Sequence, residues 1–340
     1  ENRELQPVFH ERSGLMLSAH YAGPKLAALA GTDAAISRGL RDGRLRFRTL
    51  DALLLERRGG SASTDPGMAA RTGLFDIETL DWSETLCKMF GVDPACLPPV
   101  VSTNGLDCAT SPTTVVRAAL ADQSAALVGL TGADAGAVLV NLGTGAFVLR
   151  PTADGSTRRA GYLTGILRAD RDTEALYALE GAISGSGPAI DRFRAGQPGL
   201  TTEDPAPDLF AIPDGAGLGA PHWRPEIGAT FSRPQSSLGR AEAHRALLEG
   251  LLFRVREVFD ELVAGADGTR VSLAGGMAAE PFLAQGLASL LDRPVRRLDV
   301  PEAALRGAAM TALGATRLAA PDATVFDPAP EGGYLADKYV

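Results

Sequence analysis

The sequence has few cysteines, few aromatic residues and no hydrophobic run long enough to cross a bilayer. Its three cysteines, Cys87, Cys96 and Cys108, are odd in number and show no CxxC spacing, and its four histidines lie far apart. These absences argue against a disulfide framework and against a metal site built from cysteine and histidine. No signal peptide opens the chain. We therefore expect a reduced, cytoplasmic protein without a membrane partner.

Basic patches are also missing, because Lys and Arg are scattered through a chain of net charge −8 and isoelectric point near 5.2. This argues against nucleic acid as a partner. The composition, with 45% hydrophobic and 22% charged residues, is typical of a globular protein. The length of 340 residues is enough for two domains. The chain starts at Glu1 without a methionine, on "ENRELQPVFHERSG", which is typical of the middle of a longer sequence.

Helical patterns dominate the first part of the chain. Residues 14–60 are expected to be mostly helical, residues 61–73 to form a loop or a short strand with turns, and "DWSETLCKMFGV" to form an amphipathic helix. Residues 101–116 are polar and irregular. They lead into "RAALADQSAALVGLTGADAGAVLVNLGTGAFVLRP", residues 117–151, which we interpret as the border between two domains.

Strands alternate with helices in the second part, which predicts the α/β class. Residues 138–140 and 147–149 indicate two buried strands joined by a glycine turn. The segment "TEALYALEGAISGSGPAIDRF" is expected to be helical at both ends, and "RAEAHRALLEGLLFRVREVFDELV" to form a long amphipathic helix. After these come a strand, a Gly-Gly turn and a helix in "TRVSLAGGMAAEPFLAQGLASLL", a strand in "RPVRRLDV" and a helix in "EAALRGAAMTALGA".

Glycine turns recur in this second part. They are Gly143-Thr144-Gly145, Gly185-Ser186-Gly187, Gly275-Gly276 and the loop 215–219. Glycine lets backbone N–H groups approach a ligand closely, and a turn or a helix start aims these donors at an anion. One such turn is usually a plain connection. Three in one domain, each after a strand or opening a helix, predict a shared nucleotide cleft.

Asp122 is a lone carboxylate among small apolar residues, about twenty positions before Thr144. A carboxylate beside a phosphate cradle can take a proton from an attacking hydroxyl, so Asp122 is a candidate general base. Aspartate is also a favoured helix N-cap, and capping of the helix "QSAALVGL" is the alternative role. The two roles are compatible.

Taken together, many segments resemble the FGGY carbohydrate kinases, the family of glycerol kinase and xylulokinase. "ALADQSAALVGL" is similar to their catalytic-aspartate motif, "NLGTGAFVL" to their phosphate-binding turn and "SLAGGMAAEPFL" to their adenosine motif. The resemblance extends, in order, to "SGLMLSAHYAGPKLAAL", "TDPGMAARTGLFDIETLDWSETLCKMFGV", "LPPV", "YALEGAISGSGPAIDRF", "GLGAPHWRPEIGATF" and "EAALRGAAMTAL". It therefore covers nearly the whole chain.

This resemblance implies an α/β, actin-like (ribonuclease H-like) fold of two domains, with the active site in the cleft between them. Residues 1–128 would be the remainder of the N-terminal, substrate-side domain, and residues 129–340 the C-terminal, nucleotide-binding domain. The family's DxGT-type phosphate loop is not found, so the first domain is expected to be incomplete. Exposed apolar surface on such a domain would favour a homodimer.

The implied activity is ATP-dependent phosphorylation of a hydroxyl on a small sugar or polyol, with Mg²⁺ neutralising the phosphates. Asp122 would be the base, and Gln123 would contact the substrate. The nucleotide would be held at its phosphates by Gly143, Thr144 and Gly145, at its ribose by Gly187 and Asp191, and at its adenine by Gly276 and Glu280, with Gly275 in the same turn. The substrate-pocket candidates are His20, Tyr21 and Phe147.

Some positions depart from the family pattern. Ala274 replaces an aspartate, Glu280 an asparagine and Asp191 a glutamine, which leaves nucleotide preference and substrate open. The alternative function is therefore a degenerate homologue that binds nucleotide or sugar without catalysis. A chaperone-type ATPase ranks third, because it would not need "ADQSAA" and "GLGAPHW". A surface or packing role remains equally open for His20, and packing is favoured over substrate contact for Trp223.

Overall fold

The computed structural model describes residues 4–106, 108–170, 174–194, 207–264, 268–315, 321–330 and 333–340. The chain forms two compact units. Unit 1 comprises Glu1–Ala133, Pro151–Leu179 and Glu302–Ala320, and unit 2 comprises Asp134–Arg150, Glu180–Pro301 and Pro321–Val340. The family-domain division between residues 128 and 129 remains a prediction.

Unit 1 begins with a series of short helices. They are α1 (Gln6–Ser13), α2 (Ala22–Thr32), α3 (Ala34–Arg41), α4 (Leu50–Arg57), α5 (Pro66–Ala70), α6 (Glu84–Phe90) and the 3₁₀ turn η1 (Pro94–Cys96). Helices α2 to α4 and α6 confirm the helical expectations. Residues 61–73 differ from the expected loop or strand, because Asp65 caps α5 and Pro66 occupies its first position. An aspartate followed by proline is a strong helix start.

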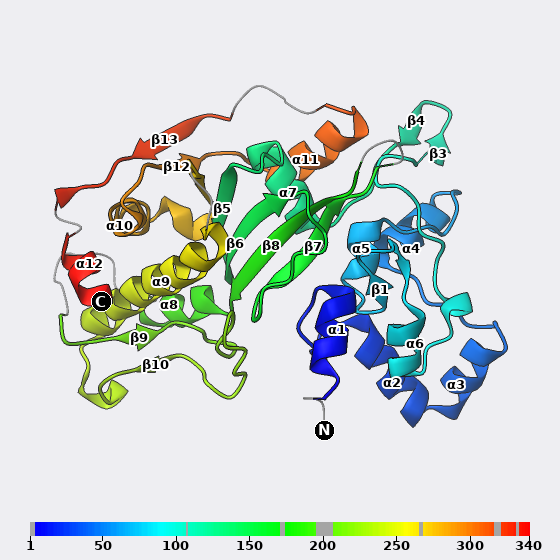
Figure 1. Cartoon of the computed structure of the whole chain (residues 1–340), viewed down its shortest axis with the longest axis horizontal. Helices are drawn as coiled ribbons and strands as arrows, with labels where there is room; N and C mark the ends of the chain where they lie inside the picture. Colours follow the sequence, from blue (N-terminus) through cyan, green and yellow to red (C-terminus); the bar gives the residue numbers. More distant parts are fainter. Residues whose placement is uncertain are drawn as a thin grey trace. The chain divides into compact units, whose positions relative to one another are not determined.

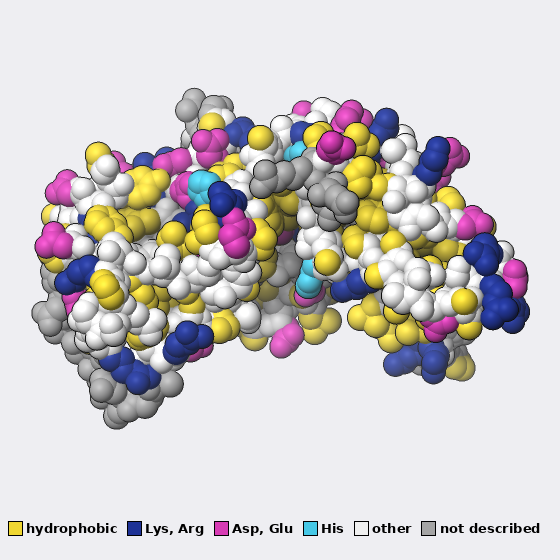
Figure 2. Space-filling model, turned by 90° about the horizontal axis from the view of Figure 1, so that it is seen from below, with side chains coloured by type: hydrophobic (Ala, Val, Ile, Leu, Met, Phe, Trp, Pro, Cys, Tyr) yellow, Lys and Arg dark blue, Asp and Glu magenta, His cyan; other side chains and the backbone are white. Residues whose placement is uncertain are grey.

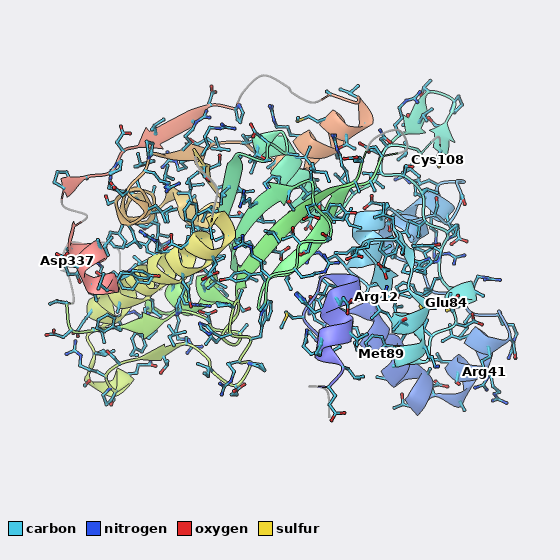
Figure 3. The ribbon with its side chains drawn as sticks, viewed as in Figure 1. Arg12, Arg41, Glu84, Met89, Cys108 and Asp337 are labelled. Carbon is cyan, nitrogen blue, oxygen red and sulfur yellow. The ribbon has the colours of Figure 1, made fainter. Side chains whose placement is uncertain are left out.

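Helix α1 is attached to unit 1 mainly by apolar packing. Phe9 is fully buried with Leu15 and Leu86, and Met89 packs against this cluster. Arg12, labelled with Met89 in Figure 3, lies 3.2 Å from the carboxylate of Asp76. Since the Arg12 side chain is 46% exposed, this ion pair adds at most about 1 kcal/mol. Burial of the Phe9 ring, worth about 1.5–3 kcal/mol, is the larger contribution.

The rest of unit 1 contains two short hairpins, one longer strand and a pair of packed helices. The strands are β1 (Phe75–Asp76), β2 (Asp81–Trp82), β3 (Cys108–Ser111), β4 (Thr114–Val116) and β7 (Leu163–Arg168). Hairpin β3–β4 lies in the segment 101–116, which the sequence presented as irregular. Helices α7 (Asp122–Thr131) and α11 (Ala303–Ala312) lie side by side, although some 170 residues separate them in the chain (Figure 1).

The main sheet has seven strands in the order β13-β12-β11-β5-β6-β8-β7. Its further strands are β5 (Ala137–Leu142), β6 (Ala146–Thr152), β8 (Leu176–Ile183), β11 (Arg270–Ala274), β12 (Val295–Leu298) and β13 (Ala323–Phe326). Strand β11 runs parallel to β5 and β12, and β6 runs antiparallel to β5 with Val140 opposite Val148. The mixed sheet with its helices confirms the α/β class, and β5–β6 confirms the predicted strand pair.

Strand β8 replaces a helix that the sequence predicted. Its residues Leu176–Ile183 are rich in Ala, Leu and Glu, which are helix formers. The strand is buried along almost its whole length and lies between β6 and β7 in the sheet. Burial on both faces is typical of an inner strand and outweighs the small differences in helix propensity. The second half of the segment is helical as expected, in α8 (Ser186–Arg194).

Unit 2 is built on the long helix α9 (Arg240–Val263), which contacts α8 and α10 (Pro281–Leu291). The predicted apolar stripe of α9 is confirmed, because its members are all at most 1% exposed: Leu247, Leu251, Val255, Val258, Phe259 and Leu262. Smaller elements complete the unit: β9 (Ala211–Ile212), β10 (Thr230–Phe231), η2 (Gln235–Ser237), η3 (Gly276–Ala279) and α12 (Gly333–Tyr339).

The three cysteines are buried and unpaired. Burial raises the pKa of the Cys87 thiol to about 12, so this thiol stays protonated and unreactive. In the described part of the chain, no helix has the length and apolar character needed to cross a membrane.

The charged side chains of the molecule are mixed in sign. On the face that Figure 2 shows, Lys and Arg lie singly or in small groups with Asp and Glu among them. Arg44, for example, lies 3.0 Å from Asp42. The absence of a nucleic-acid partner stays a prediction.

Asp65 is a buried carboxylate within unit 1. Thr103 Oγ1 donates to Asp65 Oδ1 at 2.6 Å, and the Met68 N–H donates to Oδ2 at 3.0 Å. The Thr103 hydroxyl in turn accepts the Ala169 N–H at 2.9 Å. The side chain is so deeply buried that desolvation raises the pKa of Asp65 to about 7 in spite of these bonds.

We expect Asp65 to lower the free energy of unfolding as the pH rises from about 4 to about 7. Over this range the unfolded carboxyl has lost its proton while the folded carboxyl still holds it, so deprotonation favours unfolding. The loss is on the order of 4 kcal/mol, at about 1.4 kcal/mol for each pH unit between the two pKa values. Urea denaturation at about pH 4.5 and about pH 7.5 measures it.

Asp65→Asn should remove this part of the pH dependence, and Asp33→Asn is its control. Asp33 also caps a helix, α3, but its side chain is exposed, so the variant should keep the wild-type pH dependence. Identical pH dependence in the wild type and Asp65→Asn would contradict the assignment.

Candidate active site

The turn 143–145 in unit 2 joins two buried antiparallel strands. Leu142 on β5 pairs with Ala146 on β6, and the Gly143 N–H donates to the Gly145 carbonyl at 2.9 Å. Thr144 at the tip is exposed. A Cβ atom on Gly143 would meet only the Gly145 oxygen, at 3.7 Å, so that side is open. The turn therefore presents a hydroxyl group and accessible glycine backbone.

Helix α8 begins against this turn. The Gly187 N–H donates to the Thr144 carbonyl at 3.1 Å, and a Cβ atom on Gly187 would lie 2.7 Å from the Gly143 oxygen. A helix N-terminus carries unpaired backbone donors and a partial positive charge, which favour an anion. Ser186, the first residue of α8, is fully buried, and its Oγ has no hydrogen-bond partner among the described residues. An unused polar group therefore lies at the same place.

Gly275 lies against the end of β5, just before the turn, because β11 runs parallel to β5, and Gly276 follows it. Ala274 pairs with Asn141, so both strands end at the same edge of the sheet. Gly275 has a φ of 96°, a conformation that favours glycine, and a Cβ atom there would overlap the Leu142 carbonyl oxygen. The three glycine turns that the sequence singled out thus meet at one edge of unit 2.

The glycine-rich loop 214–219 lies beside the start of α8. Its Ala216 N–H donates to the Ser184 carbonyl at 3.3 Å. Asp214 is fully buried, accepts the Gly219 N–H at 2.9 Å and lies 3.4 Å from the Arg254 guanidinium. These contacts hold the loop in place beside α8. Trp223, further along, is half-buried, and its role stays a prediction.

Two of the nucleotide-binding candidates, Gly187 and Asp191, lie along one face of α8 together with Arg194. Gly187, Asp191 and Arg194 are four and then three residues apart, which places them on the same side of the helix. Asp191 is exposed, and Arg194 Nη2 lies 2.8 Å from Glu280 Oε2. The sequence pointed to Asp191 and Glu280 but not to Arg194, which belongs to no motif.

Asp122 and Gln123 open helix α7 in unit 1. Ala121 is the N-cap and makes no side-chain bond, so Asp122 is the first helical residue rather than the cap. Asp122 Oδ1 accepts the Gln123 N–H at 2.7 Å, and the side chain is exposed. The carboxylate thus satisfies one backbone donor of the first turn, although Ala121 occupies the N-cap position that the capping alternative gave to Asp122. Among the described residues, its second oxygen accepts no hydrogen bond.

Helix α7 is held firmly in unit 1. Ser124 Oγ donates to the Ile166 carbonyl of β7 at 3.2 Å. On the α11 side, a Cβ atom on Gly129 would overlap the Ala303 oxygen, and Arg306 Nε donates to the Gly129 carbonyl at 2.8 Å. The Ser124 bond holds the first turn of α7, next to Asp122, and the contacts to α11 hold its last turn.

The substrate-pocket candidates belong to different units. His20 is exposed in unit 1, and its ring centroid lies 6.3 Å from that of Tyr21. Tyr21 also packs on Phe9, at 6.3 Å between ring centroids. Phe147 is half-buried on β6 in unit 2, opposite Asn141. Their substrate roles stay predictions.

The unit 2 edge fits the phosphates of a nucleotide. The glycine turn, the start of α8 and the Thr144 hydroxyl supply donors for phosphate oxygens, and Ser186 Oγ lacks a partner there. Within the described ranges, no three His, Cys, Asp or Glu side chains gather to hold a metal ion. Magnesium in kinases is commonly bound in part by phosphate oxygens.

Both parts of the chain match one family. Residues 1–129 match the N-terminal domain of the FGGY family of carbohydrate kinases, and residues 138–316 match its C-terminal domain. The chain therefore belongs to the FGGY family of carbohydrate kinases. It is 33% identical over 328 residues to a glycerol kinase of Nocardia farcinica, which covers 89% of this chain. The chain spans 65% of the length of that relative.

Solved structures show the same fold. A Plasmodium falciparum glycerol kinase with ADP has a TM-score of 0.79 and 21% identity, covering 98% of this chain and 73% of its own. A ligand-bound xylulose kinase from Lactobacillus acidophilus has a TM-score of 0.77 and 18% identity, covering 99% of this chain and 74% of its own. The actin-like fold expected from the sequence is confirmed.

Gly187→Ala is expected to lower stability and weaken nucleotide binding, because the added Cβ atom forces α8 away from the turn. Overpacking of this kind costs about 1–3 kcal/mol. Thermal unfolding with and without ATP-Mg²⁺ measures both effects, since a bound ligand raises the unfolding temperature. The variant should unfold earlier and show a smaller shift with ATP.

Gly228→Ala is the matched control, because a Cβ atom there meets no atom within 4 Å. It should behave as the wild type. An unchanged unfolding temperature in Gly187→Ala would contradict the packing argument. Lower stability with an undiminished ATP shift would contradict the role in nucleotide binding.

Proposed function

We propose that the protein transfers the γ-phosphoryl group of ATP to a hydroxyl of a small polyol or sugar. The observation that carries the proposal is the meeting of three glycine segments at the Thr144 turn, beside the start of α8. Such a group of backbone donors suits a polyphosphate. Family membership supports the same reaction, because matched relatives are named glycerol kinase and xylulose kinase.

Unit 2 would bind the nucleotide. Thr144, with the backbone of Gly143 and Gly145, would hold the β- and γ-phosphates. The nucleoside would extend along α8, with Gly187 and Asp191 at the ribose and Gly275, Gly276 and Glu280 at the adenine. Mg²⁺ bound to the phosphates would neutralise their charge during in-line transfer.

Asp122 would act as the general base, and Gln123 would contact the substrate. As the substrate oxygen bonds to the γ-phosphorus, the bond to the bridging oxygen of ADP breaks and Asp122 accepts the hydroxyl proton. Two features of Asp122 support this role: its carboxylate is exposed, and α7 is held by close contacts to α11 and β7. A fixed carboxylate loses little entropy when it meets the substrate.

Small substrates fit the proposal best, with glycerol and pentuloses ahead of hexoses. The segment "GTGAF" resembles glycerol kinase, and Phe147 within it is half-buried on β6. Its ring would supply an apolar wall against the carbon chain of a short polyol. His20 and Tyr21 are the proposed substrate contacts of unit 1.

We expect ADP release by the full-length protein with glycerol, xylulose or ribulose, and slower release with hexoses. A coupled assay over polyols, pentuloses, hexuloses and aldohexoses measures this. A response limited to aldohexoses or to compounds other than sugars would contradict the substrate proposal. ATP binding without turnover on any compound would instead favour the degenerate, nucleotide-binding alternative.

Asp122→Asn should lower kcat by at least about a hundredfold and leave ATP affinity nearly unchanged. The amide keeps the shape and the bond to Gln123 but cannot take the proton, and a general base contributes about 10²–10⁴-fold. Steady-state kinetics and ATP calorimetry test the two parts. Asp134→Asn, which follows the C-terminal end of α7, is the control and should keep the wild-type kcat. A wild-type kcat in Asp122→Asn would show that Asp122 is not the base and only bonds the backbone at the start of α7.

A further inference from the structure

Two polar atoms beside α8 are buried without a partner. Ser186 Oγ and His244 Nε2 make no hydrogen bond in the described part of the chain, and their residues are 0% and 3% exposed. A buried polar atom left unpaired costs about 1–3 kcal/mol, and native proteins rarely leave one so. An ordered water or a bound ligand could therefore supply the missing partner of each atom.

His244 lies at the opposite end of α8 from Ser186. It belongs to the first turns of α9, whose Arg240 donates to the carbonyls of Arg192 and Phe193 at 2.8 Å each. These two bonds hold the start of α9 against the last turn of α8.

Three charged side chains act electrostatically on the His244 imidazole. Arg194 and Asp191 come from α8, and Glu280 precedes α10. Burial first, and then the charge of Arg194, lower the pKa of His244, although Glu280 and Asp191 oppose this. The imidazole is therefore neutral at neutral pH, with one nitrogen that donates and one that accepts. Such a group pairs well with the polar edge of an uncharged nucleoside.

We propose that His244 Nε2 contacts the nucleoside part of the bound nucleotide, and that Ser186 Oγ contacts its phosphates. This inference rests on the proposed function. Gly187 and Arg194 are roughly 10 Å apart along α8, at 1.5 Å per residue, so the two atoms mark the ends of an elongated ligand. The phosphate end lies at the Thr144 turn, and the nucleoside end lies toward Glu280.

Both contacts require a local movement. Ser186 Oγ and His244 Nε2 are inaccessible in the present arrangement, so neighbouring groups must shift when the ligand binds. Arg194 is the more exposed member of its ion pair, at 45% against 23% for Glu280. Exposed ion pairs contribute at most about 1 kcal/mol, so opening this one costs little.

Calorimetry with ADP and with pyrophosphate on the full-length protein distinguishes the nucleoside contact of His244 from the phosphate contact of Ser186. His244→Phe keeps a ring of similar size without the nitrogens. It should weaken ADP binding about tenfold, the loss of one good hydrogen bond, and leave pyrophosphate binding unchanged. His244→Gln retains a polar group and should recover most of the ADP affinity. Ser186→Ala should weaken both ligands by a similar factor.

Stability without ligand supplies a second measurement. His244→Phe and Ser186→Ala each remove an unpaired buried polar atom, so both should unfold at the wild-type temperature or above it. Wild-type ADP affinity in His244→Phe, or an equal loss of ADP and pyrophosphate affinity, would overturn the His244 contact alone. A wild-type protein that binds neither ADP nor pyrophosphate would overturn the proposed function and this inference together.

Discussion

The hydrogen bond from the Gly187 N–H to the Thr144 carbonyl is the contact on which the unit 2 site depends. It brings the start of α8 to the turn between β5 and β6, and any Cβ atom on Gly187 would crowd the Gly143 oxygen. The parallel pairing of β5 and β11 brings Gly275 to the same edge. Three glycine segments that are distant in the sequence are thereby brought to one place. A single glycine turn would offer an anion far fewer donors.

Glycine also allows close backbone approach in unit 1, where the approach has a different effect. Gly129 on α7 and Gly307 on α11 face each other without side chains, and a Cβ atom on Gly307 would overlap the Ala125 oxygen. Helices that approach this closely make extensive backbone contact and resist sliding or rotation. In unit 2 glycine lets α8 and β11 approach the turn after β5, whereas in unit 1 it fixes a helix. The fixed helix starts with an exposed carboxylate, that of Asp122.

Local patterns predicted much of the fold, and long-range contacts account for what they missed. The strands around Gly143 and the apolar stripe of α9 follow from the spacing of apolar residues within each segment. The family motifs identified the fold as a whole. Strand β8 was missed because its helix-forming residues become a strand only between β6 and β7. Ser186 and His244 were missed because neither the burial of a polar atom nor the absence of its partner is visible in a sequence. The roles of Asp122 and the other site residues remain predictions.

Asp65 and Asp122 show why position in a motif is insufficient to assign a role. Both stand at a helix start in unit 1. Asp65 is buried, and both of its oxygens are engaged, by Thr103 and by Met68. A carboxylate so enclosed cannot meet a substrate, and its raised pKa reflects desolvation rather than readiness for catalysis. Asp122 is exposed, and one of its oxygens accepts the Gln123 N–H. Accessibility and an uncommitted oxygen distinguish Asp122, the proposed base, from the enclosed Asp65.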